Sequence, residues 1–185
     1  MTKVSELKGL TRTGVIAVLT ALAALGTLLI RIPIPATTGY FNIGDMFVIL
    51  AGLWLGPMGG LIVGAVGPTI ADAIGFPQFM LATAVTKGIE GWLVGLVGGG
   101  FRSTSLARKI AAAAVGAATI MIGYFVFEAF IYPYLARTIP FFAVTDWAAA
   151  LVELLPNAIQ GVIGAIGGVA LWRTVIGRSP EERSP

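Results

Sequence analysis

The chain has 185 residues, of which 57% are hydrophobic and only 11% are charged, and its mean hydropathy is +0.91. One soluble core needs far less apolar surface, so we predict an integral membrane protein. The chain contains no Cys and no His, which excludes disulfides, thiolate and imidazole catalysis and the common zinc sites. The net charge of +3 is better explained by orientation in a bilayer than by nucleic-acid binding, because the cations flank hydrophobic segments.

Six apolar runs are candidate spanning helices, since a transmembrane helix needs about 20 mostly apolar residues. The first run shows no cleavage-site pattern and is expected to be retained as a helix. The second and third are short and meet at Gly56-Pro57, which favours a tight turn over one bent helix. We therefore predict an all-α integral membrane protein, a compact bundle of six transmembrane helices forming one membrane domain over residues 1–185. The expected spans are about 12–30, 44–57, 58–75, 79–100, 107–134 and 147–176, with a polar tail at 177–185.

Positive residues gather on one side of these spans. Arg31 and Arg137 fall on the opposite side. The positive-inside rule then places the N and C termini in the cytoplasm and the first interhelical loop outside. The nine cations on the side of the termini are Lys3, Lys8, Arg12, Arg102, Arg108, Lys109, Arg173, Arg178 and Arg183.

The first outer loop, "IPATTGYFNIGD", carries the densest group of polar and aromatic residues. The first helix is expected to end at two prolines, Pro33 directly before this loop and Pro35 within it. Asn42 or Asp45 could accept hydrogen bonds from the free N–H groups at the start of the second span.

Ionisable residues at membrane depth are costly, so each is a candidate functional residue. Lys87 and Glu90 lie three residues apart on one face of the fourth span, where they could pair with each other or bind a ligand. Asp72 precedes the turn-like segment Gly75-Phe76-Pro77-Gln78, so it could cap the fourth span or line the mouth of a pocket.

The fifth span places aromatic residues and one carboxylate on a single helical face. Tyr124, Phe127, Glu128 and Ile131 share this face at helical spacing. They could form a stacking surface for a ligand, or an aromatic stripe that faces lipid or the core.

The sixth span contains the sharpest polar pattern, "ELLPNAIQG". Glu153, Asn157 and Gln160 stand at i, i+4 and i+7, which fall within about 60° on a helix. Pro156 frees a backbone carbonyl one turn earlier. This stripe could serve interhelical hydrogen bonding or, as we favour, a polar ligand pocket in the outer half of the membrane.

Small residues on the first span mark a possible docking face. Ala17 and Ala21 are four residues apart, a spacing that lets helix backbones approach closely. The same spacing also serves packing inside one protein.

These features leave three functional classes. The protein could be a binding subunit that depends on partners for energy, an autonomous channel or carrier, or an intramembrane enzyme. The enzyme is the least supported, because no paired-carboxylate motif is evident. The chain also lacks a phosphate-binding loop of the G-x-x-x-x-G-K-[ST] type.

Four separated motifs make the chain resemble a known family. They are "GYFNIGDMFVILAGLWLGPMGGLIVGAVGPTIAD", "TKGIEGWLVGLV", "GYFVFEAF" and "ELLPNAIQGVIG". Together they resemble the substrate-binding S components of energy-coupling factor (ECF) vitamin transporters, in particular the riboflavin-type group. The resemblance covers roughly residues 12–172 in the right order.

The resemblance implies a multi-pass protein of a prokaryotic plasma membrane that binds a vitamin or vitamin precursor from outside. It also implies association with a transmembrane T subunit and two cytoplasmic ATPase subunits, with Ala17 and Ala21 at the T-subunit contact. Neither a cofactor nor an enzymatic activity is expected. The loop between the first two helices would close over the ligand as a lid between flexible joints at Gly39 and Gly44. The implied substrate-binding residues are Tyr40, Phe41, Asn42, Asp45, Lys87, Glu90, Tyr124, Glu128, Glu153, Asn157 and Gln160.

The identity of the vitamin is left open by the residues themselves. Aromatic and amide side chains suit any planar nitrogen heterocycle, and riboflavin is the first choice. The alternatives are a pyridoxine-like, pyrimidine or corrinoid compound bound by an S component, or transport by an autonomous carrier.

Overall fold

The computed structural model describes residues 9–34, 39–139, 141–142 and 146–176. The expected polar tail at 177–185 and four residues of the outer loop, 35–38, lie outside this description. The helices are α1 (Gly9–Leu29), α2 (Asp45–Leu55), α3 (Pro57–Gly75), α4 (Met80–Gly98), α5 (Leu106–Val126), α6 (Tyr132–Leu135) and α7 (Trp147–Val175). Shorter elements are the 3₁₀ turns η2 (Pro77–Phe79) and η3 (Gly100–Arg102), the π-helical segment η4 (Phe127–Ile131), and strands β1 (Ile32–Ile34) and β2 (Gly39–Phe41).

The predicted all-α membrane bundle is confirmed, with one difference in span length. Five helices of the described chain are long and apolar enough to cross a membrane. The second predicted span is shorter than expected, because α2 has 11 residues and rises only roughly 17 Å. It therefore reaches about halfway through a hydrocarbon core of about 30 Å. The turn expected at Gly56-Pro57 is present, since Gly56 has a φ of 83° and separates α2 from α3.

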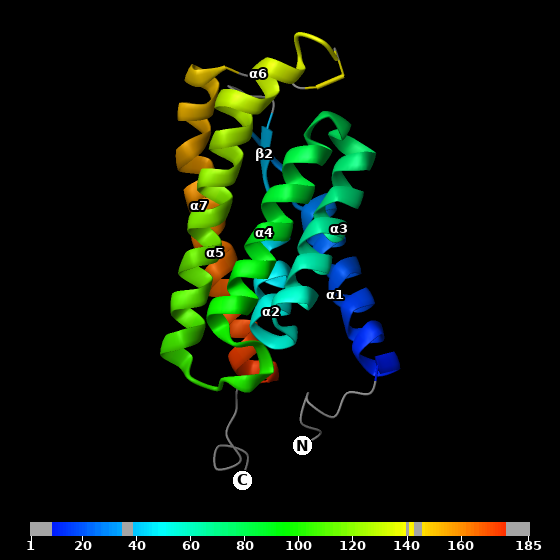
Figure 1. Cartoon of the computed structure of the whole chain (residues 1–185), viewed down its shortest axis with the longest axis vertical. Helices are drawn as coiled ribbons and strands as arrows, with labels where there is room; N and C mark the ends of the chain where they lie inside the picture. Colours follow the sequence, from blue (N-terminus) through cyan, green and yellow to red (C-terminus); the bar gives the residue numbers. More distant parts are fainter. Residues whose placement is uncertain (1–8, 35–38, 140, 143–145, 177–185) are drawn as a thin grey trace.

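The short helix α2 lies inside the bundle, against α3, α4 and α7 (Figure 1). Its sequence is apolar all round, as expected for a helix covered on every side. Val48, Ile49 and Leu53 have no exposed surface. Strand β2, which precedes α2 in the chain, lies beyond the start of α2 toward the end of the bundle that holds α6 (Figure 1).

Helices α3 and α4 pack more closely than any side chain would permit. A Cβ atom placed on Gly60 would lie 2.1 Å from the carbonyl oxygen of Gly91, and the reverse substitution would meet the carbonyl of Gly60 at 2.1 Å. Small residues allow such contact where lipid supplies no hydrophobic drive between helices.

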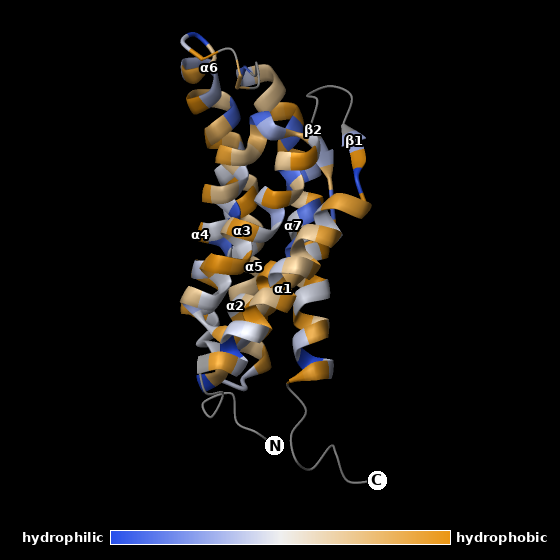
Figure 2. Ribbon diagram, turned by 90° about the vertical axis from the view of Figure 1, so that its right-hand side faces the viewer, coloured by the Kyte–Doolittle hydropathy of each residue, from blue (hydrophilic) through white to orange (hydrophobic). Residues whose placement is uncertain are grey.

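The two ends of the bundle differ in character. The start of α1 and the end of α7 lie at one end, and the hairpin and α6 lie toward the other (Figures 1 and 2). Near the first end, the buried Lys109 ammonium donates to the carbonyls of Leu53, Gly98 and Gly100 at 2.7, 3.1 and 2.6 Å. These carbonyls belong to the C-terminal ends of α2 and α4 and to η3, so one cation joins three segments and favourably meets two helix dipoles.

Candidate functional site

The outer hairpin places one aromatic side chain against the bundle. Strand β2 pairs antiparallel with β1, with Tyr40 opposite Pro33. Tyr40 stacks on Phe76 with ring centroids 4.5 Å apart, and the Arg31 guanidinium lies 5.1 Å from the Tyr40 ring centroid. The phenol donates a hydrogen bond to Asp72. Burial, and secondarily the Asp72 carboxylate, raise the pKa of Tyr40 far above its usual value, so the phenol keeps the proton that it donates.

Asn42 fastens the end of this hairpin to two helices. Its backbone N–H donates to Gln160 Oε1 of α7 at 2.9 Å, and its side-chain Nδ2 donates to the same oxygen at 3.3 Å. Its Oδ1 accepts from the Gly44 amide at 2.9 Å and from the Thr27 hydroxyl of α1 at 3.4 Å. The hairpin therefore closes against α1 and α7 through a single buried amide.

The Lys87–Glu90 ion pair, one of the two roles considered for these residues, is not formed, because Lys87 pairs with Asp45 instead. Both side chains are about 1% exposed, and Gln160 Nε2 donates to the second Asp45 oxygen at 2.8 Å. Asp45 thus serves as the counter-charge of Lys87 and does not cap α2. The residue before α2 is Gly44, at which no side-chain capping bond is formed.

Glu90 lies outside this network. Its side chain is fully buried, and neither carboxyl oxygen has a hydrogen-bond partner among the described residues. It lies beside Gly116, where an added Cβ would be 3.5 Å from Glu90 Cγ. The structure does not bring it to the cavity described next, contrary to its predicted place in the site.

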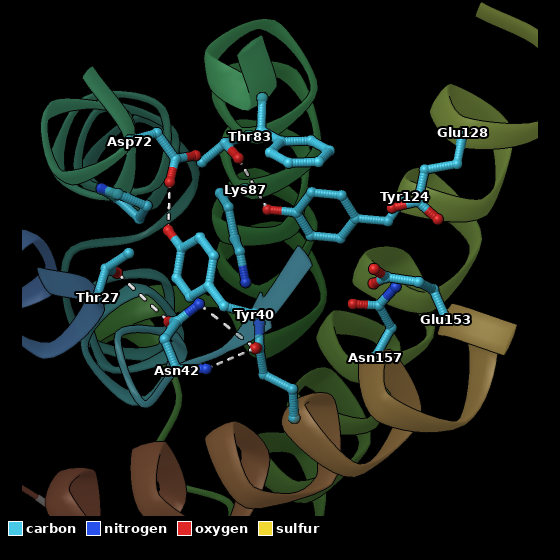
Figure 3. Close-up of a pocket in the computed structure, with 13 residues that line it drawn as sticks. Thr27, Tyr40, Asn42, Asp72, Thr83, Lys87, Tyr124, Glu128, Glu153 and Asn157 are labelled. Atoms are coloured by element: carbon cyan, nitrogen blue, oxygen red, sulfur yellow. Dashed lines mark hydrogen bonds between the residues drawn. The ribbon is translucent and has the colours of Figure 1, made fainter. Parts of the chain in front are cut away.

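A small cavity lies beneath the hairpin, among α1, α3, α4, α5 and α7 (Figure 3). Its free volume is about 30 Å³, enough for only a few water molecules. Two of its side chains, Thr83 and Tyr124, are joined by a hydrogen bond of 3.0 Å, and the Lys87 ammonium lies 5.5 Å from the Tyr124 ring centroid. The lining residues are Thr27, Tyr40, Asn42, Pro68, Asp72, Phe79, Thr83, Lys87, Tyr124, Glu128, Glu153, Asn157 and Gln160.

Most of the predicted site residues therefore meet at one cavity. Phe41, Asp45 and Glu90 do not line it. Phe41 follows Tyr40 on the same strand, and successive strand residues point to opposite faces. Asp45 contacts the cavity only indirectly, through Lys87 and Gln160.

The polar stripe of α7 forms interhelical hydrogen bonds and also lines the cavity. Glu153, Asn157 and Gln160 are all buried and all line the cavity. Gln160 forms interhelical hydrogen bonds with Asn42 and Asp45. The Asn157 side chain is buried and makes no hydrogen bond with the described residues, so its amide remains available to the cavity.

The predicted common face of the fifth span is only partly correct. A π-helical segment at Phe127–Ile131 interrupts the regular helix, and such a segment rotates the residues that follow it. Tyr124 and Glu128 line the cavity. Phe127 instead belongs to an aromatic cluster with Tyr132, and Ile131 packs against that cluster.

A comparison with known protein families shows which family the chain belongs to. The model of the family "ECF-type riboflavin transporter, S component" matches residues 10–176. The chain belongs to this family. As an S component it is a multi-pass membrane protein, consistent with its five long apolar helices, and its family is one of transporter components and not of enzymes.

This S component also resembles a curated protein of Pyrococcus woesei, described as an uncharacterized protein in a gap 3' region. The two are 41% identical over 98 residues, which is 53% of this chain and 65% of the relative. The similar stretch thus spans just under two thirds of that protein.

Four cavity residues of the S component had no separate signal in the sequence. Thr27, Thr83, Pro68 and Phe79 each stand alone within apolar helical segments, where small polar and aromatic residues are common. Thr27 and Thr83 could have been noticed because buried hydroxyl groups in a membrane helix need partners. Asp72, by contrast, fulfils the second of its two predicted roles and lines the cavity.

The two alanines predicted to dock a partner lie away from the cavity. Ala17 and Ala21 are both exposed on α1. An extra Cβ on the nearby Gly14 would meet nothing within 4 Å, so this face of the S component is open in the described structure.

Proposed function

We propose that this S component binds a planar heterocyclic vitamin, with riboflavin as the first choice, from outside the cell for ATP-driven uptake by partner subunits. The observation that carries the proposal is the buried polar cavity beneath the hairpin, which gathers residues from five helices and the predicted lid. Strand β2, whose Tyr40 lines the cavity, lies toward the end opposite the start of α1 and the end of α7 (Figure 1). The positive-inside bias of the sequence assigns that end to the outside.

The side chains around the cavity suit a flat, nitrogen-rich ligand. Phe79 and Tyr124 offer aromatic surfaces on which a ring can stack. The Asn157 amide supplies both donors and an acceptor, and it is not engaged by the described residues. Most of the other lining residues are polar or charged, so the ligand is expected to carry several hydrogen-bonding groups in addition to its rings.

Binding a vitamin requires the cavity to enlarge. Ligand pockets usually measure about 300–1,000 Å³, whereas the free volume here is about 30 Å³. The hairpin is the part best suited to move, because its contacts with the cavity are a few hydrogen bonds and one aromatic stack. We propose that Tyr40 and Asn42 move outward to admit the ligand and close over it afterwards.

We also propose that energy comes from a T subunit and two ATPase subunits. The chain has no phosphate-binding loop of its own. The exposed face of α1 around Ala17 and Ala21 offers a surface on which a transmembrane partner could pack closely.

The direct test is to purify the protein in detergent and identify the small molecules that remain bound by mass spectrometry. A yellow preparation with flavin fluorescence is expected. A colourless preparation that retains a pyridoxine-like, pyrimidine or corrinoid compound would replace riboflavin but keep the S-component function. Uptake by vesicles that contain this chain alone, without ATPases, would instead support an autonomous carrier.

A further inference from the structure

A second hollow lies near the end of the bundle that holds the start of α1 and the end of α7. It has a volume of about 560 Å³ and is bordered by the start of α1, the α2–α3 turn and the connection from α4 through η3 to α5. Three arginines from three different elements line it, Arg12, Arg102 and Arg108. We call it the arginine groove.

The charge of the arginine groove is not balanced within the described structure. A guanidinium stays charged at any physiological pH. Arg12 donates to the Leu55 carbonyl at 3.2 Å and Arg108 to the Val97 carbonyl at 2.6 Å. Neither acceptor is a carboxylate, and the ion pair found among the described residues is Lys87–Asp45, in a different part of the molecule.

The bonds to these carbonyls hold the guanidinium groups in place without neutralising them. Arg12 is fixed to the last residue of α2, and Arg108 is fixed near the end of α4. Arg108 also lies over Gly99, where an added Cβ would be 3.1 Å from its Cζ atom. Because a guanidinium carries five N–H donors, each of these arginines keeps donors for an anion.

One side of the same groove is apolar and exposed on the surface of the protein. Met58, Leu96 and Phe101 line it and are 57%, 52% and 40% exposed. Met58 continues along α3 into Ile62 and Val66, which are 39% and 43% exposed and follow at four-residue spacing on one helical face. The groove thus joins a cationic pocket to an apolar stripe that runs into the membrane.

We propose that the arginine groove binds an anionic phospholipid. Arg12, Arg102 and Arg108 hold the headgroup phosphate, for which guanidinium geometry is well suited. The acyl chains lie along the exposed stripe that begins at Met58. A lipid fits this site better than an acidic protein segment does, because the apolar side opens into the part of the helix surface that faces lipid.

The test compares phosphatidylglycerol with phosphatidylcholine, each titrated onto the full chain in neutral detergent. Lipid retention is measured by native mass spectrometry. The wild type is expected to prefer phosphatidylglycerol. The R102Q/R108Q variant should bind phosphatidylglycerol less tightly by about fivefold for each arginine removed, while its binding of phosphatidylcholine stays the same.

Arg173→Gln is the matched control, because Arg173 is exposed on α7 and does not line the groove. It should leave phosphatidylglycerol binding unchanged. The single variant R102Q guards against misfolding, because the Arg102 side chain makes no hydrogen bond with the described residues; unchanged helical circular dichroism would verify the fold.

Four results would overturn the proposal. They are equal binding of the two lipids by the wild type, an equal loss in R173Q, and full displacement of phosphatidylglycerol by the same concentration of inorganic phosphate. The fourth is loss of T-subunit co-purification in R102Q/R108Q with lipid binding unchanged, which would assign the groove to a protein partner.

Discussion

At the scale of single residues, the outer half of the bundle depends on charges paired across the chain. Asp45 and Lys87 are 42 positions apart, and Gln160 binds the same carboxylate from a third helix. Breaking one side of a buried pair is costly, because the remaining charge has neither water nor a partner. The pair therefore holds the start of α2 against α4 beside the cavity.

Asp45→Asn and Lys87→Met should each lower the free energy of unfolding by about 3–5 kcal/mol. The double variant D45N/K87M should lose less than either single variant, because no uncompensated charge remains. Apparent unfolding in detergent, followed by circular dichroism, measures all three. Glu90→Gln is the control and should cost under about 1 kcal/mol, since no hydrogen bond of Glu90 is broken. A larger loss in E90Q than in D45N would restore the predicted Lys87–Glu90 pair.

This pairing shows why sequence alone could identify the participants but not their partners. Spacing along one helix suggested that Lys87 would meet Glu90, since residues three apart share a face. The actual partner, Asp45, comes from another helix, α2. Helix spacing carries no information about such contacts, which depend on how far each helix extends into the bundle.

Asn157 and Gln160 allow ligand binding to be separated from stability. Both line the cavity, but only the Gln160 side chain forms hydrogen bonds with other described residues. Asn157→Leu should weaken vitamin binding about fivefold, the value of one hydrogen bond, and leave the unfolding temperature nearly unchanged. Gln160→Leu should lower the free energy of unfolding by at least about 2 kcal/mol, because buried groups of Asn42 and Asp45 lose their partners.

Ligand titration by fluorescence or calorimetry, together with thermal unfolding, measures both effects. If N157L bound the vitamin as tightly as the wild type, the α7 stripe would be a structural feature and not part of the site.

At the scale of elements, the hairpin and the π-helical segment are the parts that could not be predicted from sequence patterns. The long helices follow from runs of about 20 apolar residues, and the turn at Gly56-Pro57 follows from its composition. Each strand of the hairpin has only three residues, which is too few for the alternation of apolar and polar residues that identifies a strand in a sequence. The sequence also gives no signal for the π-helical segment at Phe127–Ile131, within which Glu128 lines the cavity and Phe127 does not.

The hairpin should behave as a gate whose closed state depends on Tyr40. Tyr40→Phe keeps the stacking on Phe76 but removes the hydrogen bond to Asp72. Because that bond involves a carboxylate, its loss should speed vitamin dissociation about tenfold or more. Stopped-flow measurement of ligand release detects this change directly.

The neighbouring Phe41→Leu is a matched control, because Phe41 lies on the same strand but does not line the cavity. Its dissociation rate should equal that of the wild type. Equal rates for Y40F and the wild type would show that the hairpin does not retain the ligand through this bond.

At the scale of the whole molecule, the two ends of the bundle and the exposed face of α1 differ in structure. The cavity proposed to hold the vitamin lies beneath the hairpin, whereas Lys109 at the other end binds three carbonyl groups. Within the described structure the cavity lining does not extend to the residues around Lys109. If the proposed function holds, ligand that enters beneath the hairpin can leave at the other end only after a movement, which we propose that the partner subunits drive.

The exposed alanine face of α1 is the proposed contact for that partner. A17W/A21W should abolish co-purification with the T and ATPase subunits, because two indole rings prevent the close approach that small residues allow. Vitamin binding by the isolated variant should remain at the wild-type level, since neither alanine lines the cavity. Pull-down of the assembled complex and ligand titration of the free subunit measure the two properties separately. The control A111W/A118W places the same bulk on exposed alanines of α5 and should assemble normally. If A17W/A21W assembled as well as this control, the docking face would have to lie elsewhere on the bundle.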